Sequence, residues 1–138
     1  MDLIRALPEF NLYEDFWKIY TNSDHQPPQY TAPGAKVKES LITDGCEIYG
    51  EVYRSILGPG VIVKKGAVVR DSIIMCDSVI GENSVLDRTI VDEECTIGDG
   101  VQIGVGENAP NEAKPNIYYS GISVVGVKTT VPNHVTIG

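Results

Sequence analysis

An aliphatic residue recurs at almost every sixth position along much of this 138-residue chain. In the stretch 79–104, Ile80 and Ile97 are each followed by glycine, and Leu86 and Ile103 come six residues after them. Four longer segments of 15, 15, 17 and 17 residues also align with one another, and a fifth begins at Ile97. Their bounds are 33–47, 48–62, 63–79 and 80–96. Each contains a hydroxyl residue before two aliphatic residues: Ser40-Leu41-Ile42, Ser55-Ile56-Leu57, Ser72-Ile73-Ile74 and Thr89-Ile90-Val91. The chain is therefore a repeat protein.

The length of the repeat predicts which kind of repeat protein it is. Helical repeats need about 33 residues or more, so 15–17 residues are too few for a helix pair. Three short strands of about five residues, each ending in a tight turn, would return the chain about 4.8 Å above its starting point. The sequence therefore predicts an all-β fold, a parallel β-helix of hexapeptide repeats with three faces. Stability then comes from stacking several coils, because one coil alone buries little surface.

Two sets of residues follow from this prediction. Aliphatic pairs six residues apart should point inward on successive faces: Val63 and Val69, Ile80 and Leu86, Ile97 and Ile103. Glycines at turn positions should supply backbone conformations that a β-carbon would penalise: Gly66, Gly81, Gly98 and Gly104.

The repeat divides the chain into an arm and a solenoid. Residues 1–32 hold the only Trp, both Phe and three of the seven Tyr, and we expect a linker arm there; 2–7 could end a helix, and 11–20 could be helical or extended. Residues 33–138 form the predicted β-helix. The prolines and asparagines of about 104–121 indicate a loop insertion, after which Val125, Val131 and Ile137 resume the period. At Gly138 we expect either a cut chain or an open coil end.

Composition narrows the function classes. The net charge of −8 argues against nucleic acid and anionic membranes as partners, since both need a positive field. No apolar run is long enough for a transmembrane helix, and the first residues do not resemble a secretory signal. Cys46, Cys76 and Cys95 form no CxxC pair and are expected to be reduced thiols of a cytoplasmic protein.

Few residues offer chemistry. His25 and His134 are predicted to be solvent-exposed, and two histidines are too few for a three-histidine zinc site. The carboxylates Asp92, Glu93, Glu94 and Asp99 are expected to form a solvated rim. We predict no catalytic residue, no bound cofactor and no metal site. A further set is cationic and outward-facing, and either binds a phosphorylated ligand or only solubilises the chain: Lys64, Lys65, Arg70, Arg88 and Lys128.

Several stretches resemble one family. The arm contains Asn11-Leu12-Tyr13, Trp17, Ile19-Tyr20-Thr21 and Pro27-Pro28, and "SLITDGCEIYGEVYRSILGPGVIVKKGAVVRDSIIM" follows it. Both resemble the C-terminal part of bacterial ADP-glucose pyrophosphorylases (glucose-1-phosphate adenylyltransferases). The segment 120–126, "SGISVVG", fits the same family.

This resemblance implies a left-handed β-helix that follows an N-terminal nucleotidyltransferase domain. The full-length parent would use ATP, magnesium and glucose 1-phosphate to make ADP-glucose and pyrophosphate for glycogen synthesis, or it would be a catalytically weak regulatory paralogue. The β-helix, non-catalytic alone, would contact its own catalytic domain and other subunits of a tetramer, and would mediate control by a phosphorylated effector. Arg88 and Lys128 are the candidate allosteric anion-binding residues. Glu93 stands where some members have an arginine, so the effector contacts are expected to differ from theirs.

Two other functions stay open on the sequence. A hexapeptide-repeat acyltransferase would use His134 as a general base and an acyl-CoA donor. A ligand-free scaffold would need neither an active site nor an effector.

Overall fold

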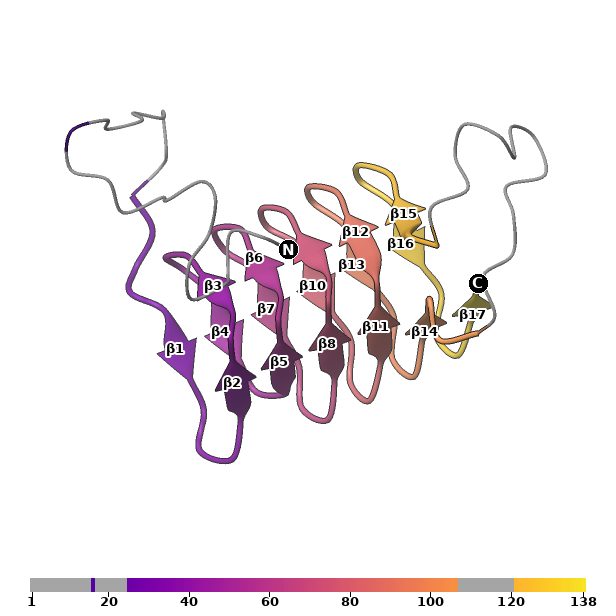
Figure 1. Cartoon of the computed structure of the whole chain (residues 1–138), viewed down its shortest axis with the longest axis horizontal. Helices are drawn as coiled ribbons and strands as arrows, with labels where there is room; N and C mark the ends of the chain where they lie inside the picture. Colours follow the sequence, from indigo (N-terminus) through magenta and orange to yellow (C-terminus); the bar gives the residue numbers. More distant parts are fainter. Residues whose placement is uncertain (1–15, 17–24, 107–120) are drawn as a thin grey trace.

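The computed structural model describes residue 16 and residues 25–106 and 121–138. Within these ranges the regular structure consists of short parallel strands grouped in three sheets, here called A, B and C. Figure 1 shows them stacked along one long axis, so that three successive strands make one coil. None of the described segments forms a helix of the length and apolarity needed to cross a membrane.

Each sheet takes every third strand. Sheet A contains β1 (Tyr30–Thr31), β4 (Glu47–Ile48), β7 (Ile62–Val63), β10 (Val79–Ile80), β13 (Thr96–Ile97) and β16 (Thr130–Val131). Sheet B contains β2 (Lys36–Lys38), β5 (Glu51–Tyr53), β8 (Val68–Arg70), β11 (Val85–Asp87), β14 (Gln102–Ile103) and β17 (Thr136–Ile137). Sheet C contains β3 (Leu41–Ile42), β6 (Ile56–Leu57), β9 (Ile73–Ile74), β12 (Thr89–Val91) and β15 (Ser123–Val125). We number the coils from β1–β3 as coil 1.

The register confirms the predicted parallel β-helix. Leu41 pairs with Ile56, fifteen residues on, and Ile56 pairs with Ile73, seventeen residues on. The left-handed sense of the coil stays a prediction from the family resemblance. The strands are two or three residues long rather than about five, because the chain turns at each corner through backbone conformations that no strand adopts.

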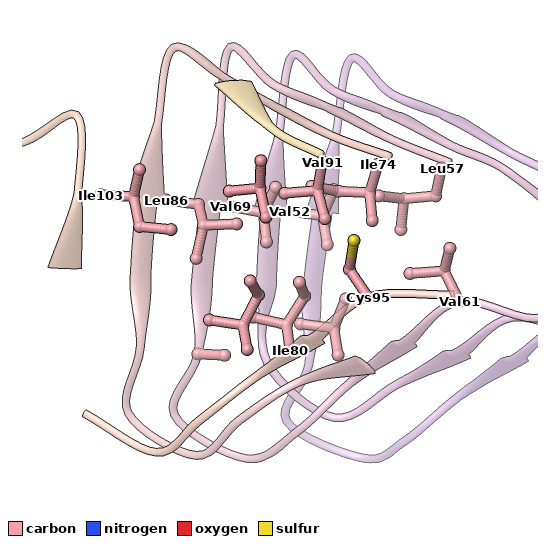
Figure 2. Close-up of a cluster of buried hydrophobic side chains, with 14 of the residues drawn as sticks. Val52, Leu57, Val61, Val69, Ile74, Ile80, Leu86, Val91, Cys95 and Ile103 are labelled. Atoms are coloured by element: carbon pink, nitrogen blue, oxygen red, sulfur yellow. The ribbon is translucent and has the colours of Figure 1, made fainter. Parts of the chain in front are cut away.

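The predicted inward pairs form the core. Val63, Val69, Ile80, Leu86 and Ile103 are fully buried. Figure 2 shows their counterparts in neighbouring coils lying in rows, such as Val52, Val69, Leu86 and Ile103 on sheet B. Each row continues because the same strand position recurs one coil higher. Ile137 pairs with Ile103 in the sheet B row and is 40% exposed.

The repeated hydroxyl residues form a hydrogen-bonded ladder between sheets B and C. The Ser72 hydroxyl accepts the Thr89 N–H at 3.0 Å and donates to the Arg70 carbonyl. Ser55 acts in the same way one coil earlier, accepting the Ser72 N–H at 3.2 Å. Among the described residues no buried side-chain nitrogen or oxygen lacks a partner. The hydroxyls therefore satisfy backbone groups that turn inward at a corner.

The four predicted turn glycines divide into two kinds. Gly66 and Gly104 have left-handed backbones, with φ of 74° and 71°. For Gly81 and Gly98 the reason is space instead: a β-carbon on Gly81 would collide with the Gly98 carbonyl oxygen, and one on Gly98 would meet the Asn133 side chain and backbone. The conformational explanation is therefore wrong for Gly81 and Gly98, where one coil approaches the next too closely for a side chain.

The solenoid begins slightly before its predicted start. β1 lies at Tyr30–Thr31, and the Tyr30 N–H donates to the Cys46 carbonyl at 2.8 Å, so the first coil opens before Pro33. β14 ends at Ile103 and β15 begins at Ser123, and the loop insertion at about 104–121 stays a prediction. Most of the insertion and the helical or extended segments expected within 1–24 lie outside the described residues.

We predict that Ser72→Ala lowers the free energy of unfolding by about 1–3 kcal/mol, because the buried Thr89 N–H loses its acceptor. Urea denaturation followed by circular dichroism measures the loss. Ser40→Ala is the matched control: Ser40 makes the same two bonds in the first coil, but it is half-exposed and water can replace it. Equal losses for the two variants would contradict a role for burial.

Candidate functional site

The turns that join the sheets form three edges along the solenoid. Most of the charged candidate residues lie on these edges. Edge AB joins sheets A and B, edge BC joins sheets B and C, and edge CA joins sheet C to sheet A of the next coil. Each edge repeats a left-handed residue, and nine of those in the described ranges are not glycine. Such a residue costs roughly 1–2 kcal/mol relative to its ordinary conformation, so the stacking of the coils must offset that strain.

Edge BC carries four charges of alternating sign, which we call the charge ladder: Glu39, Arg54, Asp71 and Arg88. Their φ angles are 48°, 44°, 46° and 48°, so each occupies the same left-handed turn position. The N–H of Arg54 donates to the Lys38 carbonyl at 3.0 Å, and Asp71 repeats this bond with the Tyr53 carbonyl. The charges are therefore stacked one per coil.

The two central residues of the charge ladder, Arg54 and Asp71, form an ion pair joined by two hydrogen bonds. Arg54 Nε and Nη2 donate to the two Asp71 carboxylate oxygens at 2.7 and 2.6 Å. These hydrogen bonds lower the pKa of Asp71, and the same contact raises the pKa of Arg54. Arg88 is half-buried at the next rung, where its Nη2 donates to the Gly104 carbonyl at 3.1 Å.

Lys128 lies on edge CA instead. It is left-handed (φ 56°), and its N–H donates to the Glu93 carbonyl at 2.9 Å. Its ammonium group is 3.5 Å from Glu94, and both side chains are exposed. Glu93 itself is exposed on the same edge. The charge of Lys128 is therefore partly balanced by an acidic neighbour.

The structure does not bring Arg88 and Lys128 together. Arg88 immediately precedes β12, whereas Lys128 follows β15, the strand that pairs with β12. The two residues thus lie at opposite ends of sheet C. They therefore lie on different edges of the solenoid, Arg88 on edge BC and Lys128 on edge CA.

A recess on edge AB arises from one shortened corner. Coil 2 passes from Ile48 to Glu51, where coil 3 takes the longer route from Val63 to Val68. The two absent residues leave a hollow of about 720 Å³. It is lined by Ala32, Pro33, Gly34, Tyr49, Gly50, Glu51, Lys65, Gly66, Val68, Glu82 and Asn83. This lining carries one lysine and two carboxylates, which does not favour an anionic ligand.

One of those carboxylates is already engaged. Glu51 accepts a hydrogen bond from Lys36 at 2.8 Å and another from the Tyr53 hydroxyl at 2.7 Å. The Lys36 bond is the largest cause that lowers the pKa of Glu51. Gly50 lines the recess, and no side chain fits there, because a β-carbon would collide with the Ala67 carbonyl oxygen.

The histidines are both exposed, as predicted. His134 is left-handed (φ 59°) on edge AB, and its N–H donates to the Asp99 carbonyl at 2.8 Å. In the described ranges no three His, Cys, Asp or Glu residues are grouped as metal ligands would be. Burial raises the pKa of Cys46 and, together with Glu93, that of Cys76, so neither thiol is activated as a nucleophile.

Two of the carboxylates expected to form a solvated rim also bind backbone groups. Asp99 accepts the Glu82 N–H at 2.7 Å, and Asp92 accepts the Glu93 N–H at 2.8 Å. Both side chains are half-exposed. They therefore hold turns in place as well as facing water.

Sequence reasoning missed the charge ladder and the recess, although both left a signal. The residue before each repeated hydroxyl alternates in charge, from Glu39 to Arg88. The second aligned segment is also two residues shorter than the third. Each signal becomes visible only when equivalent positions in successive repeats are compared.

We predict that Asp71→Asn destabilises the chain at pH 7 and that this destabilisation shrinks as the pH falls toward 2. Because the folded pKa of Asp71 is lowered, its stabilisation is present above the unfolded pKa of about 3.9 and is lost as the pH falls. Thermal unfolding should show a loss of roughly 1–3 °C at pH 7. Asp77→Asn is the control, since Asp77 shares the left-handed geometry (φ 55°) on edge CA. A loss that persists unchanged at pH 2 would show that the ion pair is not its cause.

The chain is similar to known proteins over most or all of its length. The family model described as "GlmU-like, C-terminal hexapeptide" matches residues 28–125. Glucose-1-phosphate adenylyltransferases align over all 138 residues: those of Acetivibrio thermocellus (51% identical), Lachnospira eligens (53%) and Ruminiclostridium cellulolyticum (50%). The chain covers 32%, 33% and 32% of their lengths, and so spans about a third of these relatives. The chain belongs to the GlmU-like, C-terminal hexapeptide family, and it matches the C-terminal third of glucose-1-phosphate adenylyltransferases.

Proposed function

We propose that this chain is the regulatory and oligomerisation β-helix of a cytoplasmic glucose-1-phosphate adenylyltransferase. The full-length parent makes ADP-glucose and pyrophosphate from ATP and glucose 1-phosphate, with magnesium, for glycogen synthesis. The observation that carries this proposal is the 51% identity over the whole chain to the Acetivibrio thermocellus enzyme. Identity at this level, extended over every coil, is far more specific than a hexapeptide period.

The way the chain uses its polar groups supports a non-catalytic role for this segment. The buried hydroxyls of Ser55, Ser72 and Thr89 bond to neighbouring backbone groups rather than to one another in a cleft. The doubly hydrogen-bonded ion pair of Arg54 with Asp71 lies on an exposed edge. ATP, magnesium and glucose 1-phosphate would then bind to the parent's other two thirds.

A phosphorylated effector is the second part of the proposal, with Arg88 and Lys128 as its candidate contacts. They lie at opposite ends of sheet C, so each would act with groups from the catalytic domain or another subunit. Lys128 is exposed and its acidic partner Glu94 is 3.5 Å away, which leaves its ammonium group accessible to an anion. Glu93 would keep the effector contacts different from those of relatives with an arginine there.

We predict that the longer protein containing this chain releases pyrophosphate when supplied with ATP, glucose 1-phosphate and Mg²⁺, and that residues 1–138 alone do not. A coupled pyrophosphate assay with chromatographic detection of ADP-glucose measures both. Turnover by the isolated chain would overturn its non-catalytic role. A longer protein that forms no ADP-glucose would overturn the parent activity or identify a regulatory paralogue.

We also predict that Lys128→Ala in the longer protein reduces the stabilisation that sugar phosphates, AMP or phosphate give in a thermal-shift assay. Lys64→Ala is the matched control, because Lys64 is also exposed but lies on edge AB. If both variants keep the full shift, or if no anion produces one, Lys128 is not an effector contact.

A further inference from the structure

The outer face of sheet C carries an unbroken column of aliphatic side chains, which we call the sheet C stripe. It comprises Leu41, Ile56, Ile73, Ile90 and Val124, each paired in register with the next. The first four are half-buried by their neighbours, and Val124 is 69% exposed. In Figure 1 the labelled strands β3, β6, β12 and β15 show the course of this face along the solenoid.

The other two sheets lack such a column in the described part of the chain. The corresponding column of sheet A includes Glu47, Thr96 and Thr130. The column of sheet B includes Lys36, Glu51 and Gln102. Water therefore meets a mixed surface on sheets A and B, and a continuous apolar one on sheet C. An apolar stripe rimmed by charge marks an interaction surface.

The charge ladder borders this stripe. Each ladder residue stands two positions before a stripe residue, as Glu39 does before Leu41 and Arg88 before Ile90. Read from coil 1 to coil 4, the ladder is negative, positive, negative, positive. Read in reverse, every sign is opposite. The edge is therefore electrostatically complementary to a second copy of itself that runs the other way.

We propose that two copies of this chain pack sheet C against sheet C, with their solenoid axes antiparallel. The two-fold axis runs along the strand direction, between β6 and β9. It places Ile56 against Ile73 and Leu41 against Ile90, and it brings the two BC edges side by side. Glu39 then faces Arg88 of the other copy, and Arg54 faces Asp71.

The alternative two-fold arrangement, with parallel solenoids, is disfavoured by charge. It would set edge BC against edge CA of the other copy, coil by coil. Glu39 and Arg54 would then face the uncharged Gly45 and Gly60, and Asp71 would face Asp77. Only Arg88 would gain an opposite charge, at Glu94. One like pair and one opposite pair offset each other, whereas the antiparallel arrangement makes an opposite pair at every position of the ladder, so it is the one selected.

The contact between the two copies is small. Four paired coils span about 14 Å between their outermost strands, at one strand spacing each. Such an interface is at the low end of known ones, so we expect weak association of the chain alone. The inference specifies the self-association in the proposed function. Its test measures mass rather than ADP-glucose, so the two can fail separately.

The charge ladder offers a clean test. We expect Glu39→Lys and Arg88→Glu each to weaken the dimer about tenfold, since the two-fold axis makes each contact twice. The double variant should restore it. Within one copy the two residues are three coils apart, roughly 14 Å, a distance at which mutational effects normally add. Restoration therefore requires contact between copies. Sedimentation velocity from about 10 µM to about 1 mM measures the dimer fraction.

A second pair of variants tests the stripe without touching the ladder. Ile73→Lys on sheet C should abolish the dimer, whereas Ile62→Lys, equally half-buried on the outer face of sheet A, should not. Circular dichroism establishes that both variants fold. A monomer at every concentration overturns the proposal, as do additive effects of the two ladder substitutions. Equal effects of the two isoleucine variants would also overturn it.

Discussion

Parallel hydrogen bonding between successive coils is the constraint on which this structure depends. The chain must return about 4.8 Å above itself after three strands, so each strand residue stacks on the equivalent residue of the preceding coil. The result is a set of columns, and those that face the core or form the turns keep one feature throughout: aliphatic side chains at Val52 and Val69, hydroxyls at Ser55 and Ser72, and a left-handed backbone at Arg54 and Asp71. A residue that did not suit its column would disturb two neighbours at once.

The corners are where this constraint leaves freedom. Their side chains point away from the core, so charge can vary there while the backbone geometry stays fixed. The alternation from Glu39 to Arg88 uses that freedom to place opposite charges on adjacent coils. The same arrangement makes edge BC suited to an antiparallel copy. Local stability and self-recognition thus come from one column of residues.

Sequence reasoning succeeded where a residue's role depends on its own column. The burial of Ile80 and Leu86 followed from the six-residue spacing alone. It was weaker where the role depends on a neighbour some seventeen residues away. Gly81 is small because of the Gly98 carbonyl, and Arg88 is separated from Lys128 by the width of a sheet. Neither relation is local in sequence, and the short period carries no information about which edge a charge occupies.

The shortened corner of coil 2 shows how such a chain can change length over evolutionary time. Coil 2 lacks two residues between Ile48 and Val52, yet both side chains remain buried. The corner after Ile103 differs in the other direction: 22 positions separate Ile103 from Val125, where five separate their paired equivalents Leu86 and Val91, and all four side chains are buried. The register of the core is therefore kept by the paired strands on either side of a corner and not by the length of the corner. Differences in length would then be concentrated at the edges of the solenoid, while the interior keeps the same repeated pattern of buried side chains.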